Sequence, residues 1–257
     1  MATIINQGAE IYYEHHFQRA ELPTILLSHG YSATSQMWQG QLESLADIAN
    51  VIVWDMRGHG QSDSPEDPSQ YSEALTVSDM TALLDTCGVE RAIVGGLSLG
   101  GYMTMAFHYA HRDRCQALTL FDTGPGYKSA EAREGWNATA EARAVDLETR
   151  GLDALGASAE VRVAQHRSAQ GLAHAARGML AQTDDRIIRS LPDIEMPVLV
   201  LVGEEDQPFL IPTDYMAGKI PHATRVVIPA AGHASNIDQP ELFNAALKSF
   251  LRLIHIA

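Results

Sequence analysis

The chain has 257 residues, of which 46% are hydrophobic and 19% charged, enough for one sizeable core with an inserted subdomain. Its formal net charge of −14 argues against nucleic acid or an anionic membrane as a partner. No apolar stretch reaches transmembrane length and the first residues lack a signal-peptide pattern, so we expect a cytoplasmic protein. The sequence does not indicate an oligomeric state.

Short apolar strands alternate with helices in the first half of the chain. Strands are predicted at residues 11–17, 24–28, 51–55, 92–97 and 117–121. Helices are predicted at residues 36–48, 76–87 and 99–111, the second beginning at Thr76 or Ser78. This alternation predicts an α/β fold with a doubly wound, mostly parallel sheet that is covered on both faces.

The alternation is interrupted between residues 128 and 190, where Ala, Glu and Arg dominate and only helices are expected. It resumes with strands at 197–202 and 225–228, a short helix near Ala217 and a closing amphipathic helix at 239–253. We therefore predict a core of residues 1–126 and 191–257, with a helical cap at residues 127–190.

The segment Gly95-Gly96-Leu97-Ser98-Leu99-Gly100-Gly101 lies at a predicted strand-to-helix junction. It lacks the Lys of a P-loop and the glycine spacing of a dinucleotide fingerprint, but it fits G-x-S-x-G. In that motif a sharp turn holds the serine above the sheet, and the positions two before and two after it must be small. The pattern predicts Ser98 as a nucleophile, provided that a base lies within hydrogen-bond reach.

The other catalytic candidates follow predicted strands, because chemistry in parallel sheets gathers at the carboxyl ends of the strands. His233 follows the last strand and a glycine, so we predict it as the general base. Asp206 follows the strand at 197–202 and is predicted to orient His233, with Asp122 as the competing acid. His29 is interpreted as a buried structural residue.

Hydrolysis of an acyl compound also needs donors for the developing oxyanion. We predict the backbone N–H groups of Tyr31 and Leu99, because Gly30 allows close approach of the chain. The candidate substrate-binding side chains are Tyr31, Trp136 and Phe209.

No metal or organic cofactor is expected. Cys87 and Cys115 form no metal motif and give no reason to expect a disulfide. His108 and His111 share a predicted helix, but no further ligand at helical spacing completes a metal set, so we interpret them as packing or surface residues.

With these motifs in order, the chain resembles the α/β-hydrolase fold family over essentially its whole length. The motifs, in chain order, are Ser28-His29-Gly30-Tyr31, residues 55–62 (DMRGHGQS), Gly96 to Gly100, residues 203–206 (GEED) and Gly232-His233. The nucleophile, acid and base follow the family's order. The resemblance implies that the turn around His59 is structural.

Within the family the chain is similar to small bacterial esterases and 3-oxoadipate enol-lactonases. The resemblance predicts a serine hydrolase of small-molecule esters or lactones that works through an acyl-enzyme on Ser98. The alternatives are a C–C bond hydrolase of ring-cleavage diketones and a non-enzymatic ligand-binding protein. The C–C hydrolases usually carry a glycine-rich loop where Tyr31-Ser32-Ala33-Thr34 stands here, and a serine at position 98 argues against the families with an Asp nucleophile.

Overall fold

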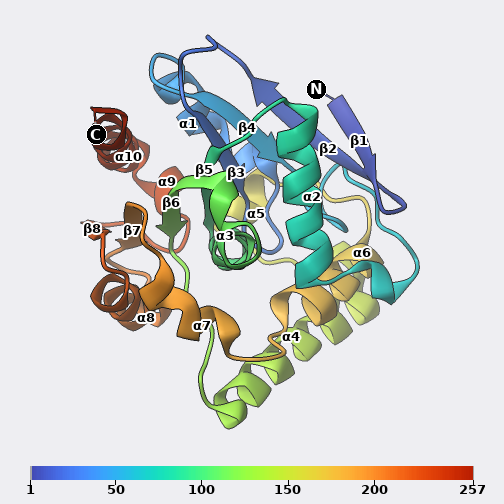
Figure 1. Ribbon diagram of the computed structural model, residues 1–257. Helices are drawn as coiled ribbons and strands as arrows, with labels where there is room; N and C mark the ends of the chain where they lie inside the picture. The colour runs from blue at the N-terminus through green and yellow to red at the C-terminus, as the bar shows by residue number, and fades with distance from the viewer. Residues whose placement is uncertain (1, 257) are drawn as a thin grey trace.

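An eight-stranded sheet forms the centre of the structure, a computed structural model that describes residues 2–256 (Figure 1). The strand order is β1-β2-β4-β3-β5-β6-β7-β8, with β1 and β2 antiparallel to their neighbours and the rest parallel. The strands are β1 (Ala2–Asn6), β2 (Ala9–His16), β3 (Thr24–Ser28), β4 (Asn50–Trp54), β5 (Ala92–Leu97), β6 (Cys115–Phe121), β7 (Val198–Gly203) and β8 (Ala223–Ile228). The predicted mostly parallel sheet is confirmed.

Helices cover both faces of this sheet and also fill the interruption between β6 and β7. They are α1 (Gln39–Leu45), α2 (Glu73–Thr86), α3 (Leu99–Ala110), α4 (Ala130–Arg150), α5 (Ala159–Val163), α6 (Ala169–Ala175), α7 (Arg186–Ser190), α8 (Gln207–Lys219), α9 (Ser235–Asp238) and α10 (Pro240–Ile256). In Figure 1, α4 and α6 lie together below the sheet. No helix among residues 2–256 combines the length and apolar character needed to cross a membrane.

The two faces of the sheet bury separate hydrophobic clusters because side chains alternate along each strand. Ile25 and Leu27 of β3 pack into the cluster that α10 closes with Phe243. Leu26 points to the opposite face and packs into the cluster that contains Met103 of α3. Helices α1 and α10 therefore cover one face, whereas α2, α3 and α8 cover the other.

Strand β1 was not predicted, because its five residues are mostly exposed and carry no burial pattern of their own. It pairs with β2 through a two-residue hairpin at Gln7 and Gly8, which both have positive φ. Helix α2 begins at Glu73 and not at Thr76 or Ser78. The N-cap residue of α2 is Ser72. Its backbone is extended, and its hydroxyl accepts the Leu75 N–H at 3.1 Å.

The first predicted helix is shorter than expected. A 3₁₀ turn, η1 (Ser35–Trp38), precedes α1, and α1 ends at Leu45, whose carbonyl accepts the N–H groups of both Ile48 and Ala49. The two cysteines are free, with Cys115 buried at the start of β6 and Cys87 half-buried after α2.

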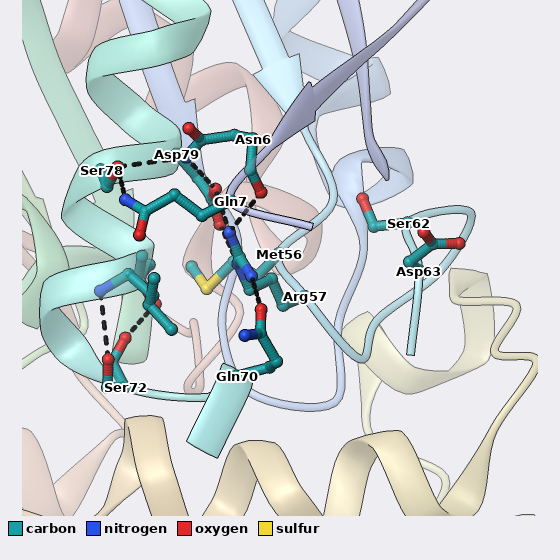
Figure 2. A network of polar contacts seen from close by, with 12 residues as sticks. Asn6, Gln7, Met56, Arg57, Ser62, Asp63, Gln70, Ser72, Ser78 and Asp79 are labelled. Carbon is teal, nitrogen blue, oxygen red and sulfur yellow. Dashed lines mark hydrogen bonds and ion pairs between the residues drawn. The ribbon is translucent and has the colours of Figure 1, made fainter. Parts of the chain in front are cut away.

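The turn after β4 is anchored by a buried ion pair, shown in Figure 2. Arg57 donates to both carboxylate oxygens of Asp79 on α2, at 2.7 and 2.9 Å, and both side chains are fully buried. The Arg57 guanidinium also donates to the Gln70 side chain and to the Asn6 carbonyl, at 2.9 and 2.8 Å. One side chain thereby joins β1, the turn and α2.

This ion pair generates a prediction on stability. The Asp79→Ala substitution leaves the buried Arg57 charge without a carboxylate partner and should lower the free energy of unfolding by about 3–5 kcal/mol. Asp85→Ala is the matched control on the same helix, because the Asp85 carboxylate that pairs with Arg114 is 62% exposed and its loss should cost about 1 kcal/mol or less. Urea denaturation measures both, and equal losses would contradict the structural role of Arg57.

Candidate active site

Ser98 lies on a strained turn between β5 and α3. Its φ is 55° and its ψ is −116°, a conformation that non-glycine residues rarely adopt. The neighbouring strand fixes this peptide, because the Ser98 N–H donates to the Phe121 carbonyl at 2.9 Å and the Thr123 hydroxyl donates to the Ser98 carbonyl at 2.6 Å. The turn therefore holds its geometry before any ligand binds.

The glycines around Ser98 are explained by close backbone packing. A Cβ on Gly100 would lie 2.2 Å from the Ser28 carbonyl oxygen, and a Cβ on Gly96 would lie 2.4 Å from the carbonyl carbon of Gly100. Neither position has room for a side chain. This agrees with the requirement for small residues two before and two after the serine.

His233 and Asp206 are joined by a hydrogen bond of 2.8 Å between Nδ1 and Oδ2. Asp206 follows β7 and is buried, with 4% of its side chain exposed, whereas His233 follows β8 and is one-third exposed. Because the carboxylate is only an acceptor, Nδ1 carries the proton and Nε2 stays available. The ring of Phe209 stacks on the imidazole at 5.0 Å.

The charge on His233 is subject to two opposing effects. Burial disfavours the imidazolium, but the hydrogen bond and negative charge of Asp206 outweigh it and raise the pKa of His233 above the ordinary histidine value. Among residues 2–256 the Ser98 hydroxyl forms no hydrogen bond. The structure thus brings the predicted base and acid into contact, and the step from Ser98 to His233 stays a prediction.

Asp122, the competing acid, has a different environment. Its carboxylate accepts the Gly203 N–H at 2.7 Å and the Ser235 hydroxyl, and it is completely buried. Burial raises the pKa of Asp122 to about 7, although these hydrogen bonds oppose the shift. Asp122 therefore ties the end of β7 to α9, and its oxygens bond to groups other than the imidazole.

The loop after β3 lies against the serine turn. A Cβ on Gly30 would be 3.4 Å from the Ser98 Cβ, so the Tyr31 peptide lies close to the candidate nucleophile. Within residues 2–256, the backbone N–H groups of Tyr31 and Leu99 donate to no carbonyl of a turn or loop. Both are candidates to donate to a ligand oxygen.

Two buried histidines organise this region. His29 Nε2 accepts the Met56 N–H at 2.9 Å, so Nδ1 carries the proton and donates to the Gly30 carbonyl at 2.7 Å. Burial lowers the pKa of His29 to about 4, which keeps the ring neutral. His59 is also buried and lies against the Tyr31 ring at 5.7 Å.

The three substrate-binding candidates have different surroundings. Phe209 touches the imidazole as described above, and Tyr31 is buried with its hydroxyl donating to the Leu172 carbonyl of α6 at 3.0 Å. The Trp136 indole N–H donates to the Leu180 carbonyl within the segment 127–190 at 2.8 Å, so this N–H already has an acceptor. The sequence analysis missed His166, a residue of the segment 127–190 that contacts the loop after β3, because a lone histidine in an irregular segment carries no pattern.

His108 is buried in α3 and His111 is half-buried at the end of that helix. Within residues 2–256, no group of three or more His, Cys, Asp or Glu side chains is placed to hold a metal ion.

Comparison with known proteins identifies the family. A model of the alpha/beta hydrolase family matches residues 25–246. The chain is 30% identical to 3-oxoadipate enol-lactonase 1 of Acinetobacter baylyi and 29% identical to a Bacillus subtilis protein provisionally named 2-succinyl-6-hydroxy-2,4-cyclohexadiene-1-carboxylate synthase, over 90% of both chains in each case. A thermophilic esterase from Thermogutta terrifontis has a TM-score of 0.81 and 31% identity, covering 98% of this chain and 97% of the esterase. The chain belongs to the alpha/beta hydrolase family.

The environment of Asp122 predicts how stability depends on pH. A carboxyl whose folded-state pKa is raised to about 7 stabilises the fold at low pH, and this stability is lost as the pH rises through about 7. Asp122→Asn removes the ionisation, and its amide can meet both the Gly203 N–H and the Ser235 hydroxyl. The free energy of unfolding of Asp122→Asn relative to wild type should therefore rise between pH 4 and 7, by at most about 1.4 kcal/mol per pH unit.

Urea denaturation at a series of pH values measures this difference. Asp113→Asn, in the exposed turn η3 (Arg112–Arg114), is the control for the loss of one carboxylate. A difference between Asp122→Asn and wild type that stays constant from pH 4 to 7 would show that Asp122 is ionised throughout this range.

Proposed function

We propose that this member of the alpha/beta hydrolase family is a serine hydrolase that cleaves carboxylic esters or lactones of small molecules. The observation that carries the proposal is the His233–Asp206 hydrogen bond, which lies at the same edge of the parallel sheet as the strained turn of Ser98. The enol-lactonase and esterase similar to this chain support the same class of reaction.

In the proposed mechanism, the Ser98 oxygen attacks the acyl carbon while His233 Nε2 takes the hydroxyl proton. The negative charge that forms on the carbonyl oxygen is stabilised by the N–H groups of Tyr31 and Leu99. The tetrahedral intermediate collapses, the C–O bond of the ester breaks, and His233 returns its proton to the leaving oxygen. Water then attacks the acyl-enzyme, with His233 again as base, and restores the Ser98 hydroxyl.

Asp206 holds the imidazole in the tautomer that this sequence of proton transfers requires. The proposed steps involve no metal or organic cofactor. The segment 127–190 is proposed as the cap that covers the site, with Tyr31, Phe209 and Trp136 contributing to the substrate pocket. In a lactone, the acyl carbon and the leaving oxygen belong to the same molecule, so hydrolysis releases a single hydroxy-acid product.

The role of Ser98 is tested by Ser98→Ala. Because the Ser98 hydroxyl has no hydrogen bond in the described chain, the variant should fold with unchanged stability. Hydrolysis of p-nitrophenyl acetate should fall by about 10⁴-fold or more. Ser249→Ala on the exposed face of α10 is the control and should retain wild-type turnover.

A fluorophosphonate probe should label the wild-type peptide that contains Ser98 and should not label Ser98→Ala. Near-normal ester hydrolysis by Ser98→Ala would exclude the mechanism. A panel of esters, lactones and ring-cleavage diketones assayed with the wild-type protein separates ester and lactone hydrolysis from C–C bond cleavage.

The assignment of Asp206 as the acid predicts losses of kcat of very different size for two conservative variants. Asp206→Asn should lower kcat by about 10⁴-fold, because an amide can donate to Nδ1 and so favours the wrong tautomer. Asp122→Asn keeps both of its hydrogen-bond partners and should lose less than about tenfold. A larger loss for Asp122→Asn would reassign the acid.

The pH profile provides an independent measure. His233 must be neutral to accept a proton, so activity is lost as the pH falls through its raised pKa. The acid limb of kcat/KM should therefore have its midpoint above the ordinary histidine value in the wild type. In Asp206→Asn that midpoint should move to lower pH, since burial then acts without the opposing carboxylate.

A further inference from the structure

His166 connects the cap to the loop that carries Tyr31. The residue lies in the irregular segment between α5 and α6, and its ring reaches two backbone groups of the core. Nε2 is 3.0 Å from the Ser32 carbonyl oxygen, and Nδ1 is 3.2 Å from the Gly60 nitrogen. The imidazole thus bridges the loop after β3 and the turn after β4.

The two partners fix the tautomer of His166. The Gly60 N–H can only donate, so Nδ1 is the acceptor, and Nε2 carries the proton that is donated to the Ser32 carbonyl. Burial lowers the pKa of His166, which favours this neutral form. Both hydrogen bonds are therefore made at neutral pH.

The loop that His166 holds is strained. The Ala33 N–H donates to the Gly30 carbonyl at 3.1 Å and closes a turn in which Ser32 has a φ of 58°. This is the position of a turn that favours glycine. Such strain persists only where surrounding contacts over-determine it, and the His166 bond to Ser32 is one such contact.

A second contact from the cap acts on the same turn. The Tyr31 hydroxyl donates to the Leu172 carbonyl of α6 at 3.0 Å. The His59 ring contacts both the Tyr31 and the His166 rings, with its centroid 5.7 Å from the first and 5.8 Å from the second. His166 and Leu172, both in the segment 127–190, therefore restrain the Gly30–Ala33 turn.

We propose that His166 is a positioning residue that locks the Gly30–Ala33 turn and so aims the Tyr31 N–H at the carbonyl oxygen of the substrate. The cap is then part of the apparatus that stabilises the oxyanion, in addition to covering the site. The inference rests on the proposed function, because it concerns the oxyanion formed when Ser98 attacks. His166 itself does not contact the reacting atoms.

The test is His166→Ala with His174→Ala as the matched control. His174 is another buried cap histidine, but its hydrogen bond is to Gln170 in its own helix. If the turn loses its alignment, kcat for p-nitrophenyl acetate should fall about ten- to a hundredfold, with KM within about threefold of wild type. His174→Ala should retain kcat within about threefold.

Two further readouts separate positioning from general destabilisation. Phenylboronic acid forms a tetrahedral adduct with a catalytic serine, so its inhibition constant should rise by the factor by which kcat falls. After subtraction of the reaction of imidazole alone with the ester, added imidazole should restore enzymatic turnover to His166→Gly and should leave that of His174→Gly unchanged. His166→Gln keeps an amide donor for the Ser32 carbonyl and should have a kcat between those of wild type and His166→Ala.

Should His166→Ala fail to fold, His166→Gln must still show reduced kcat with unchanged KM. Equal kcat in His166→Ala and His174→Ala, a change confined to KM, or no response to imidazole would each overturn the inference. The proposed function is judged separately, by ester hydrolysis and Ser98 labelling in the wild type. If these are present and the His166 variants behave as the control, only the role of His166 is rejected; if they are absent, both proposals are rejected.

Discussion

The close approach of the Ser98 turn to the end of β3 is the constraint on which the site depends. Gly100 passes so near the Ser28 carbonyl that no Cβ fits between them, and the left-handed φ of Ser98 is the consequence of turning from strand to helix in that space. The same contact brings Gly30 beside Ser98. One packing constraint thereby determines both where the serine projects and where the Tyr31 peptide lies.

The two buried acids illustrate how environment separates structural from catalytic candidates. Asp206 has an imidazole to stabilise its charge, whereas Asp122 is buried among one N–H and one hydroxyl, so burial dominates its pKa. Asp122 nevertheless affects the site through Ser235, two residues after His233. The Gly232 N–H donates to Asp238 at 2.9 Å on the other side of His233. The loop of the proposed base is therefore held on both sides by the carboxyl groups of Asp122 and Asp238.

Much of the fold could be predicted because it follows from local pattern. The apolar runs of β3, β5 and β7 and the glycines around Ser98 predict strands and a sharp turn, and the carboxyl ends of parallel strands then bring Asp206 and His233 to one edge. Strand β1 and the start of α2 were missed or misplaced, because an exposed edge strand has no burial pattern and the Ser72 cap lies before the apolar repeat begins. The catalytic roles themselves stay predictions.

His166 could not have been found in the sequence, because its role depends on tertiary contacts more than a hundred residues away along the chain. Both its partners are backbone groups, so no pair of side-chain types signals the interaction. The contact has a consequence for the whole molecule. The proposed nucleophile, acid and base each follow a strand of the central sheet, whereas residues 127–190 are inserted between β6 and β7. Under the proposed function His166 couples this inserted segment to the loop after β3, because a rearrangement of residues 164–168 would also move the Ser32 peptide to which His166 hydrogen-bonds.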